Sequence, residues 1–199
     1  MITLFLKRIS DALHKEKGYS ELLNAMVPAS FRIEIEGPKG LYLAAIVSDL
    51  TERLGKPVIL LGSSDQELET LRQDLAHTAT AVYKFPSWET LPFQGSQVQS
   101  TVHGQRTSSL WALATGKPCV VLVPLRAFLM PLGDKNFLGA YFRILKTGET
   151  IDPVRLERFL SESGYLKVPA VTVPGEFALR GEVLDLFLAG DQYPIRIVF

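Results

Sequence analysis

The 199-residue sequence has a single cysteine, no net charge, and no apolar run long enough to cross a membrane. Cys119 alone cannot form an internal disulfide, which fits a reducing compartment. Because 21 lysines and arginines balance 21 aspartates and glutamates, overall charge cannot hold the chain on nucleic acid or on an anionic membrane. With no signal peptide either, we expect a soluble, cytoplasmic protein with no membrane partner.

The sequence also lacks the residue groupings that mark metal and catalytic sites. His14, His77 and His103 fall in separate segments, with no cysteine or carboxylate beside them at metal-ligand spacing. Cys119 lies within an apolar run, where a buried strand residue is expected rather than a nucleophile. We therefore expect no catalytic residue, no metal and no cofactor in this chain.

The first pattern that is present covers residues 32–50, where a strand-like run, a glycine turn and an apolar helix follow one another. This order of elements is typical of a phosphate-binding loop. A working loop needs G-x-x-x-x-G-K-[ST], because glycine amides wrap the phosphates, lysine reaches them and a hydroxyl holds magnesium. Counting from Gly37 places Tyr42, Leu43 and Ala44 where the second glycine, the lysine and the hydroxyl should be.

The turn itself has the wrong residues for holding an anion. Lys39 comes before the position where a lysine is needed, and Pro38 removes one backbone N–H. We name Gly37, Lys39 and Gly40 the degenerate nucleotide loop, and we expect no ATP hydrolysis there.

From residue 31 to about residue 130, short apolar runs alternate with helical stretches. The expected strands are "FRIEIEG", "PVILLG", "AVYKFP" and "PCVVLVP", and the expected helices cover residues 41–54, 64–76 and 105–114. This alternation predicts a parallel sheet with crossover helices. Ser63 or Ser64, followed by Glu67, predicts a capping box at the start of the second helix.

After about residue 131 the pattern changes to one helix followed by strand-like runs. The helix is expected at residues 153–163, with Asp152 as its N-cap and Gly164 as its stop. The runs "KVPAVTV", "EFALRGEVLDLFLA" and "YPIRIVF" then predict a small antiparallel α+β domain. Helical spacing of apolar residues near the start adds a third part, so the expected parts are residues 1–30, 31–130 and 131–199. The apolar final run leads us to expect that the last domain is truncated.

The aromatic and proline-rich segment "FPSWETLPFQ", residues 85–94, follows an expected strand. We expect it to form a packed loop. A DNA-stacking role with the nearby Arg106 is the alternative, because aromatic rings and a guanidinium can hold bases.

Several motifs occur in one order: "FPSWETLPF", "QRTSSLWAL", "VVLVPLRAFLMPL", "LKTGETID", "GYLKV" and "VPGEFALRGEVLDLF". From about residue 31 to residue 199, the chain resembles the UvrB-like N-terminal region of bacterial transcription-repair coupling factors. The resemblance implies a RecA-like domain with a degenerate nucleotide site, followed by a domain that docks UvrA. UvrB is also similar, but it keeps an intact G-x-x-x-x-G-K-T and inserts a long aromatic hairpin that is absent here.

The function implied is an interaction module that recruits UvrA for nucleotide excision repair at stalled RNA polymerase. In this family the contacts with RNA polymerase and double-stranded DNA, and the ATP-driven translocase motor, belong to parts outside this chain. The alternative is an ATP-binding helicase or UvrB-type excision-repair fragment. Direct DNA binding by the RecA-like half is a third possibility.

The family places the UvrA-docking surface on the second domain, on an arginine-bearing strand that matches "EFALRGEVLDLF". The residues carried over to this chain are Arg180, Lys167, Glu182 and Phe187. If the stretch is one alternating strand, Arg180 and Glu182 share a face, unless Gly181 introduces a bulge. The structural alternative is that Arg180 only pairs with Glu182 or Glu176 on a solvated face.

Overall fold

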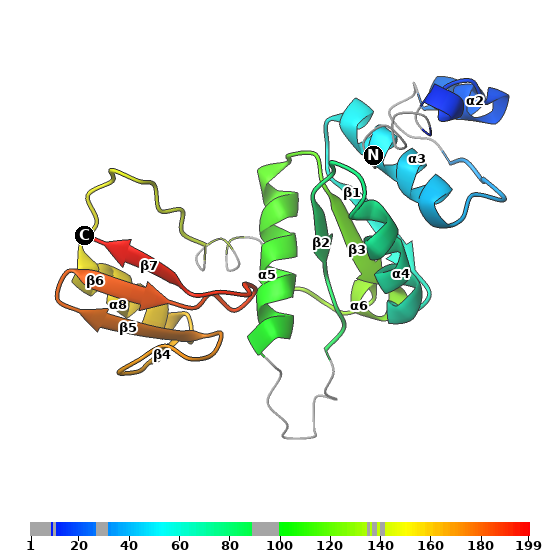
Figure 1. The fold of residues 1–199 in the computed structure, drawn as a ribbon. Coiled ribbons are helices and arrows are strands. Elements are labelled where there is room, and N and C mark those ends of the chain that lie inside the picture. The colour runs from blue at the N-terminus through cyan, green and yellow to red at the C-terminus, as the bar shows by residue number, and fades with distance from the viewer. Residues whose placement is uncertain are drawn as a thin grey trace. The chain divides into compact units, whose positions relative to one another are not determined.

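The computed structural model describes residues 9, 11–26, 32–88, 100–134, 136, 139 and 142–199. The chain divides into two compact units. The first combines Met1–Phe85 with Ala112–Leu125, and the second combines Pro86–Trp111 with Arg126–Phe199 (Figure 1). The expected domain boundaries near residues 30 and 130 stay a prediction.

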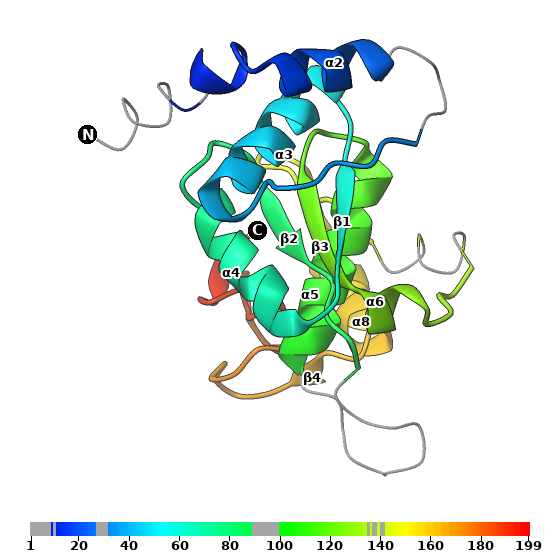
Figure 2. The same ribbon diagram turned by 90° about the vertical axis from the view of Figure 1, so that its right-hand side faces the viewer.

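The first unit contains a three-stranded parallel sheet, as its alternating pattern predicts. Its strands are β1 (Val58–Gly62), β2 (Val82–Lys84) and β3 (Val120–Pro124), arranged in the order β1-β3-β2. The helices α3 (Gly40–Leu54) and α4 (Asp65–Leu75) lie along the same side of this sheet (Figure 2). The central strand β3 is buried along its whole length, as expected for a strand paired on both edges.

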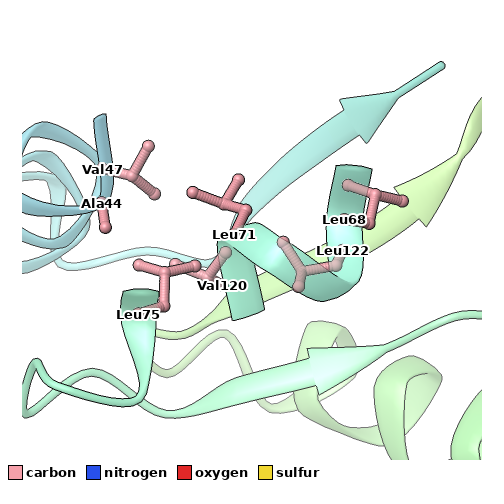
Figure 3. Packing of buried hydrophobic residues seen from close by; sticks show 7 residues of the cluster. All are labelled: Ala44, Val47, Leu68, Leu71, Leu75, Val120 and Leu122. Atoms are coloured by element: carbon pink, nitrogen blue, oxygen red, sulfur yellow. The ribbon is translucent and has the colours of Figure 1, made fainter. Parts of the chain in front are cut away.

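The two helices and the central strand enclose the main apolar core of the first unit (Figure 3). Its buried members are Ala44, Val47, Leu68, Leu71, Leu75, Val120 and Leu122. They come from α3, α4 and β3, so this core joins the sheet to both helices.

The start of α4 confirms the predicted capping box. The Ser64 hydroxyl accepts the Glu67 N–H at 3.2 Å. The Glu67 carboxylate in turn accepts the Ser63 N–H at 3.0 Å and the Ser63 hydroxyl at 2.7 Å. The cap thus satisfies backbone donors that a helix start would otherwise leave unpaired.

The helical segment before the sheet packs on α3. Leu13 together with Tyr19 and Leu22 of α2 (Lys17–Ala25) forms a buried cluster with Ile46 of α3. The Tyr19 hydroxyl also donates a hydrogen bond to the Asp49 carboxylate.

The strand expected at residues 31–37 is wrong over its described part. Residues 32–36 adopt no regular structure, and the sheet of this unit consists of β1, β2 and β3; residue 31 lies outside the described residues. Ile33 instead packs beside the cluster of Leu13 and Tyr19, while Ile35 is half exposed. Alternation of apolar and charged residues describes any extended segment, and it becomes a strand only where a neighbour supplies the hydrogen bonds.

The second unit holds a four-stranded sheet and its helices. Two helices, α5 (Ser100–Thr115) and α6 (Leu125–Phe128), have residues in both units. The other elements of the second unit are α8 (Pro153–Glu162), β4 (Leu166–Lys167), β5 (Glu176–Arg180), β6 (Val183–Leu186) and β7 (Ile195–Val198). The sheet order is β4-β5-β6-β7. Leu156 and Leu160 of α8 pack against Phe177, Leu184 and Leu186 of the sheet.

The sheet of the second unit is not wholly antiparallel as expected, because β4 pairs parallel to β5. Strand β4 is also shorter than the run "KVPAVTV" suggested. Pro169 has no N–H to donate, so the ladder with β5 ends after the bond from the Val168 N–H to the Phe177 carbonyl oxygen.

The stretch "EFALRGEVLDLFLA" is a hairpin and not one strand. Arg180 pairs with Val183 across a two-residue turn formed by Gly181 and Glu182. Gly181 has φ +60°, and a glycine with positive φ at the first central position is typical of a type II′ hairpin turn. The side of the sheet on which Arg180 lies must therefore be taken from the pairing in the hairpin, and not from alternation along one continuous strand.

Helix α8 has both predicted ends. The Asp152 carboxylate accepts the Val154 N–H at 2.9 Å, and Pro153 occupies the first turn. At the other end Gly164 has φ +87°, and the Tyr165 N–H bonds to the Leu160 carbonyl oxygen at 3.0 Å, as in a Schellman motif.

Candidate functional site

The degenerate nucleotide loop lies at the start of α3. Gly37 and Gly40 have φ +105° and +57°, values that favour glycine. Lys39 is the N-cap residue, is exposed and makes no side-chain cap.

An acidic side chain lies close to this helix start. A Cβ built on Gly40 would lie 3.8 Å from Oδ2 of Asp74, which is in α4. A carboxylate near the first turn of a helix repels another anion that approaches the N–H groups there. The local charge therefore works against a phosphate at this position.

The sheet of the second unit has one face on α8 and one face turned away from it. Leu184 and Leu186 face α8, because both belong to the buried cluster with Leu156. Asp185 lies between them and therefore points to the opposite side. Arg196 is directly across the β6–β7 ladder from Asp185, so it shares that side.

Arg180 lies on the same side, next to Leu179, which packs toward α8. Its Nη2 donates to Asp185 Oδ2 at 2.7 Å. Arg196 binds the same carboxylate through two bonds, Nε to Oδ1 at 2.6 Å and Nη2 to Oδ2 at 2.9 Å. We call Arg180, Asp185 and Arg196 the arginine face.

The charges of the arginine face are unequally exposed. The side chains of Arg180 and Arg196 are 59% and 64% exposed, whereas that of Asp185 is 13% exposed. The hydrogen bonds from Arg196 first, and then from Arg180, lower the pKa of Asp185 to about 2. At neutral pH the arginine face thus carries two positive charges and one negative charge.

Lys167 does not join the arginine face. It pairs with Phe177 in the parallel ladder, and Phe177 faces α8. The Lys167 ammonium donates to Glu157 of α8 at 2.7 Å. The structure therefore separates Lys167 from Arg180 by the thickness of the sheet.

The other two residues carried over from the resemblance differ in exposure. Glu182 is exposed in the hairpin turn, and its carbonyl oxygen accepts the Phe199 N–H at 2.9 Å. Phe187 is only 9% exposed. The expectation that Arg180 pairs with Glu182 or Glu176 is wrong, because Arg180 pairs with Asp185. Glu176 instead accepts the N–H groups of Thr172 and Val173.

Arg196 belongs to the arginine face but cannot be placed there from the sequence. It lies in "YPIRIVF", a run that predicts only a strand. The available signal was its alternation with Ile195 and Ile197, which predicts a polar face on that strand. The register that brings Arg196 to Asp185 is set by pairing between distant segments, which the pattern does not give.

Arg106 does not support a DNA-stacking role for the segment of residues 85–94. Its side chain is packed inside the second unit, with the residue 4% exposed. Nη1 donates to the Pro86 carbonyl oxygen at 2.7 Å, and the guanidinium lies 4.2 Å from the Trp88 ring centroid. A cation held in this way stabilises the placement of residues 86–88. Residues 89–94 of the motif lie outside the described residues.

Within the described parts of the chain, no three His, Cys, Asp or Glu side chains gather as a metal site would require. No helix in those same parts is long and apolar enough to span a bilayer.

The chain matches known proteins in two comparisons. Residues 144–199 match the family model of the UvrB interaction domain. The Transcription-repair-coupling factor of Escherichia coli (strain K12) is 30% identical over 161 residues, which are 80% of this chain and 14% of that protein. The protein of the same name from Borreliella burgdorferi is 27% identical over 165 residues, 82% of this chain and 15% of the relative.

A third relative covers nearly the whole chain. The Transcription-repair-coupling factor of Bacillus subtilis (strain 168) is 21% identical over 194 residues, or 96% of this chain and 16% of that protein. The chain therefore spans only about a seventh of the length of these relatives. By these matches most of the chain is similar to transcription-repair-coupling factors, and residues 144–199 match the UvrB interaction domain.

Proposed function

We propose that this chain is a protein-interaction module that binds UvrA through the arginine face of its second unit. The observation that carries the proposal is the pair of exposed guanidiniums, Arg180 and Arg196, on one face of a domain matching the UvrB interaction family. Arginine suits this task, because its planar fork can bind a carboxylate through two parallel hydrogen bonds.

The partner chemistry follows from the charge of the face. Asp185 neutralises only one of the two guanidiniums, so the face keeps a net positive charge and free N–H donors. Val183 and Val198 lie on the same side of the sheet, and Val198 is 70% exposed. A rim of charge around an apolar contact is typical of protein interfaces, so we propose an acidic surface of UvrA as the partner.

We further propose that the first unit is a RecA-like domain whose nucleotide loop is inactive. The parallel sheet with crossover helices supports the fold, and the absent lysine and hydroxyl, together with Asp74 beside Gly40, support the inactivity. In the longer protein, ATP-driven DNA translocation and binding to RNA polymerase and double-stranded DNA would then belong to other parts. The whole protein would act in the cytoplasm in nucleotide excision repair.

A binding titration with purified UvrA tests the proposed surface. Arg180→Glu should weaken UvrA binding by about 2 kcal/mol or more, the usual scale for a central interface residue. Its thermal unfolding should fall only slightly, because the ion pair lost with Asp185 involves an exposed arginine and Arg196 still binds that carboxylate.

Arg155→Glu is the matched control, since Arg155 is an exposed arginine on α8 of the same unit. It should leave UvrA affinity almost unchanged. Equal loss in both variants would indicate nonspecific charge attraction, and no loss in either would place the UvrA surface elsewhere.

A further inference from the structure

We propose that Asp185 is a positioning residue, which holds Arg180 and Arg196 in a fixed arrangement so that their remaining N–H groups are presented together to an acidic partner. This inference rests on the proposed function, and it concerns a residue that makes no contact with the partner itself. Its basis is the shared carboxylate at the centre of the arginine face.

The hydrogen bonds leave each guanidinium with donors to spare. A guanidinium carries five N–H groups in a rigid plane. Arg196 uses its Nε and Nη2 edge on Asp185, and Arg180 uses one Nη2 bond on the same carboxylate. The N–H groups that remain on the two arginines can therefore bind carboxylates of a partner while Asp185 keeps both planes in place.

The setting of Asp185 fits a support and not a contact residue. Its side chain is 13% exposed, while the two arginines that bind it are each more than half exposed. It lies on the middle of β6, paired to Ala178 on one side and Arg196 on the other, so the strand backbone fixes its position. Because the two guanidiniums lower the pKa of this carboxylate, all three groups stay ion-paired at any pH near neutral.

Asp185 could instead act as a competitor that occupies the arginines until a partner displaces it. The geometry favours positioning, because the face keeps free donors and a net positive charge with Asp185 bound. Long arginine side chains that are ordered before binding lose less conformational freedom in the complex. A partner that must break three hydrogen bonds would gain little from a preformed pair.

The test measures the rates of UvrA binding to the 199-residue chain and its variants. Asp185→Asn should weaken binding about tenfold, mainly through faster dissociation, because the arginines become mobile while their charges remain. Asp191→Asn is the matched control: it removes one negative charge from an exposed turn of the same unit and should change affinity less than twofold. A competitor role for Asp185 predicts tighter binding by Asp185→Asn, which would overturn the proposal.

A double-mutant cycle separates positioning from a general structural effect. In a chain with both Arg180→Ala and Arg196→Ala, adding Asp185→Asn should have no further effect on UvrA dissociation. The same additional loss in that background would show that Asp185 acts through the fold, and would also overturn the proposal. The proposed function fails differently: the unchanged chain would then not bind UvrA, or the two arginine substitutions would leave its binding unaltered.

Discussion

At the scale of single residues, the arginine face shows how one carboxylate can organise two cations. Arg180 is two positions from the residue directly opposite Asp185 on β5, and Arg196 is directly opposite on β7. Diagonal and direct cross-strand neighbours are both within reach of a long side chain. The arrangement therefore depends on the hairpin at Gly181, which sets the register of β5 and β6.

The pKa of Asp185 predicts how this face responds to acid. Its pKa falls from 3.8 to about 2 in the folded chain, so the folded state binds the proton less well than the unfolded state. The stabilisation is present above pH 4 and is lost as the pH falls toward 2. Urea unfolding midpoints between pH 5 and pH 2 should therefore drop less steeply for Asp185→Asn than for the unchanged chain.

Parallel pH profiles for these two chains would contradict that assignment. Glu149→Gln is a suitable control, because Glu149 is an exposed residue of the same unit whose carboxylate, among the described residues, accepts only the Lys146 N–H. Its profile should follow that of the unchanged chain much more closely than the Asp185→Asn profile does.

At the scale of elements, α5 makes one unusually close approach to the rest of the second unit. A Cβ on Gly104 would lie 2.2 Å from the Ala189 carbonyl carbon and the Gly190 nitrogen. These are backbone atoms in the turn after β6, so they cannot rotate away as a side chain would. Only glycine allows the helix to lie at this distance from the turn.

Gly104→Ala should therefore destabilise the second unit, by about 1 to 3 kcal/mol, the usual scale of overpacking. The measurement is thermal or urea unfolding. Gly18→Ala is the control within helix α2, where a new Cβ meets nothing within 4 Å. It should be neutral or stabilising by up to about 1 kcal/mol, and a loss of stability in Gly18→Ala as large as in Gly104→Ala would count against the packing argument.

Local signals predicted the elements better than they predicted the pairing. The capping residues of α4 and α8, the strands β1 to β3 and the glycine stop after α8 were all readable, because each depends on a few neighbouring residues. The strand at residues 31–37 was wrong because alternation does not show whether a partner strand is present. The hairpin at Gly181 was missed, although glycine at the first of two turn residues is a hairpin signal.

The candidate site was only half predictable for the same reason. Arg180 could be named from its motif, but the face it occupies depends on the turn that follows it. Lys167 was expected at the site, but the β4–β5 ladder turns it toward α8. Arg196, which was not expected there, lies on the arginine face. Contacts across strands depend on register, which is set by the packing of the whole sheet.

At the scale of the whole molecule, we expect the chain to bind a protein and not a nucleotide. ATP or ADP at millimolar concentration, with or without magnesium, should leave the melting temperature unchanged. A ligand at 100 times its dissociation constant stabilises the native state by about 2.7 kcal/mol, so even modest binding would be visible. A clear rise in melting temperature would contradict the inactive loop.

Amide hydrogen exchange of the 199-residue chain, with and without UvrA, reports both whether UvrA binds and where. If UvrA binds the arginine face, exchange should slow in β5 (Glu176–Arg180), β6 (Val183–Leu186) and β7 (Ile195–Val198), with no change at the start of α3 (Gly40–Leu54). No protection anywhere, or protection confined to the first unit, would contradict binding at this face.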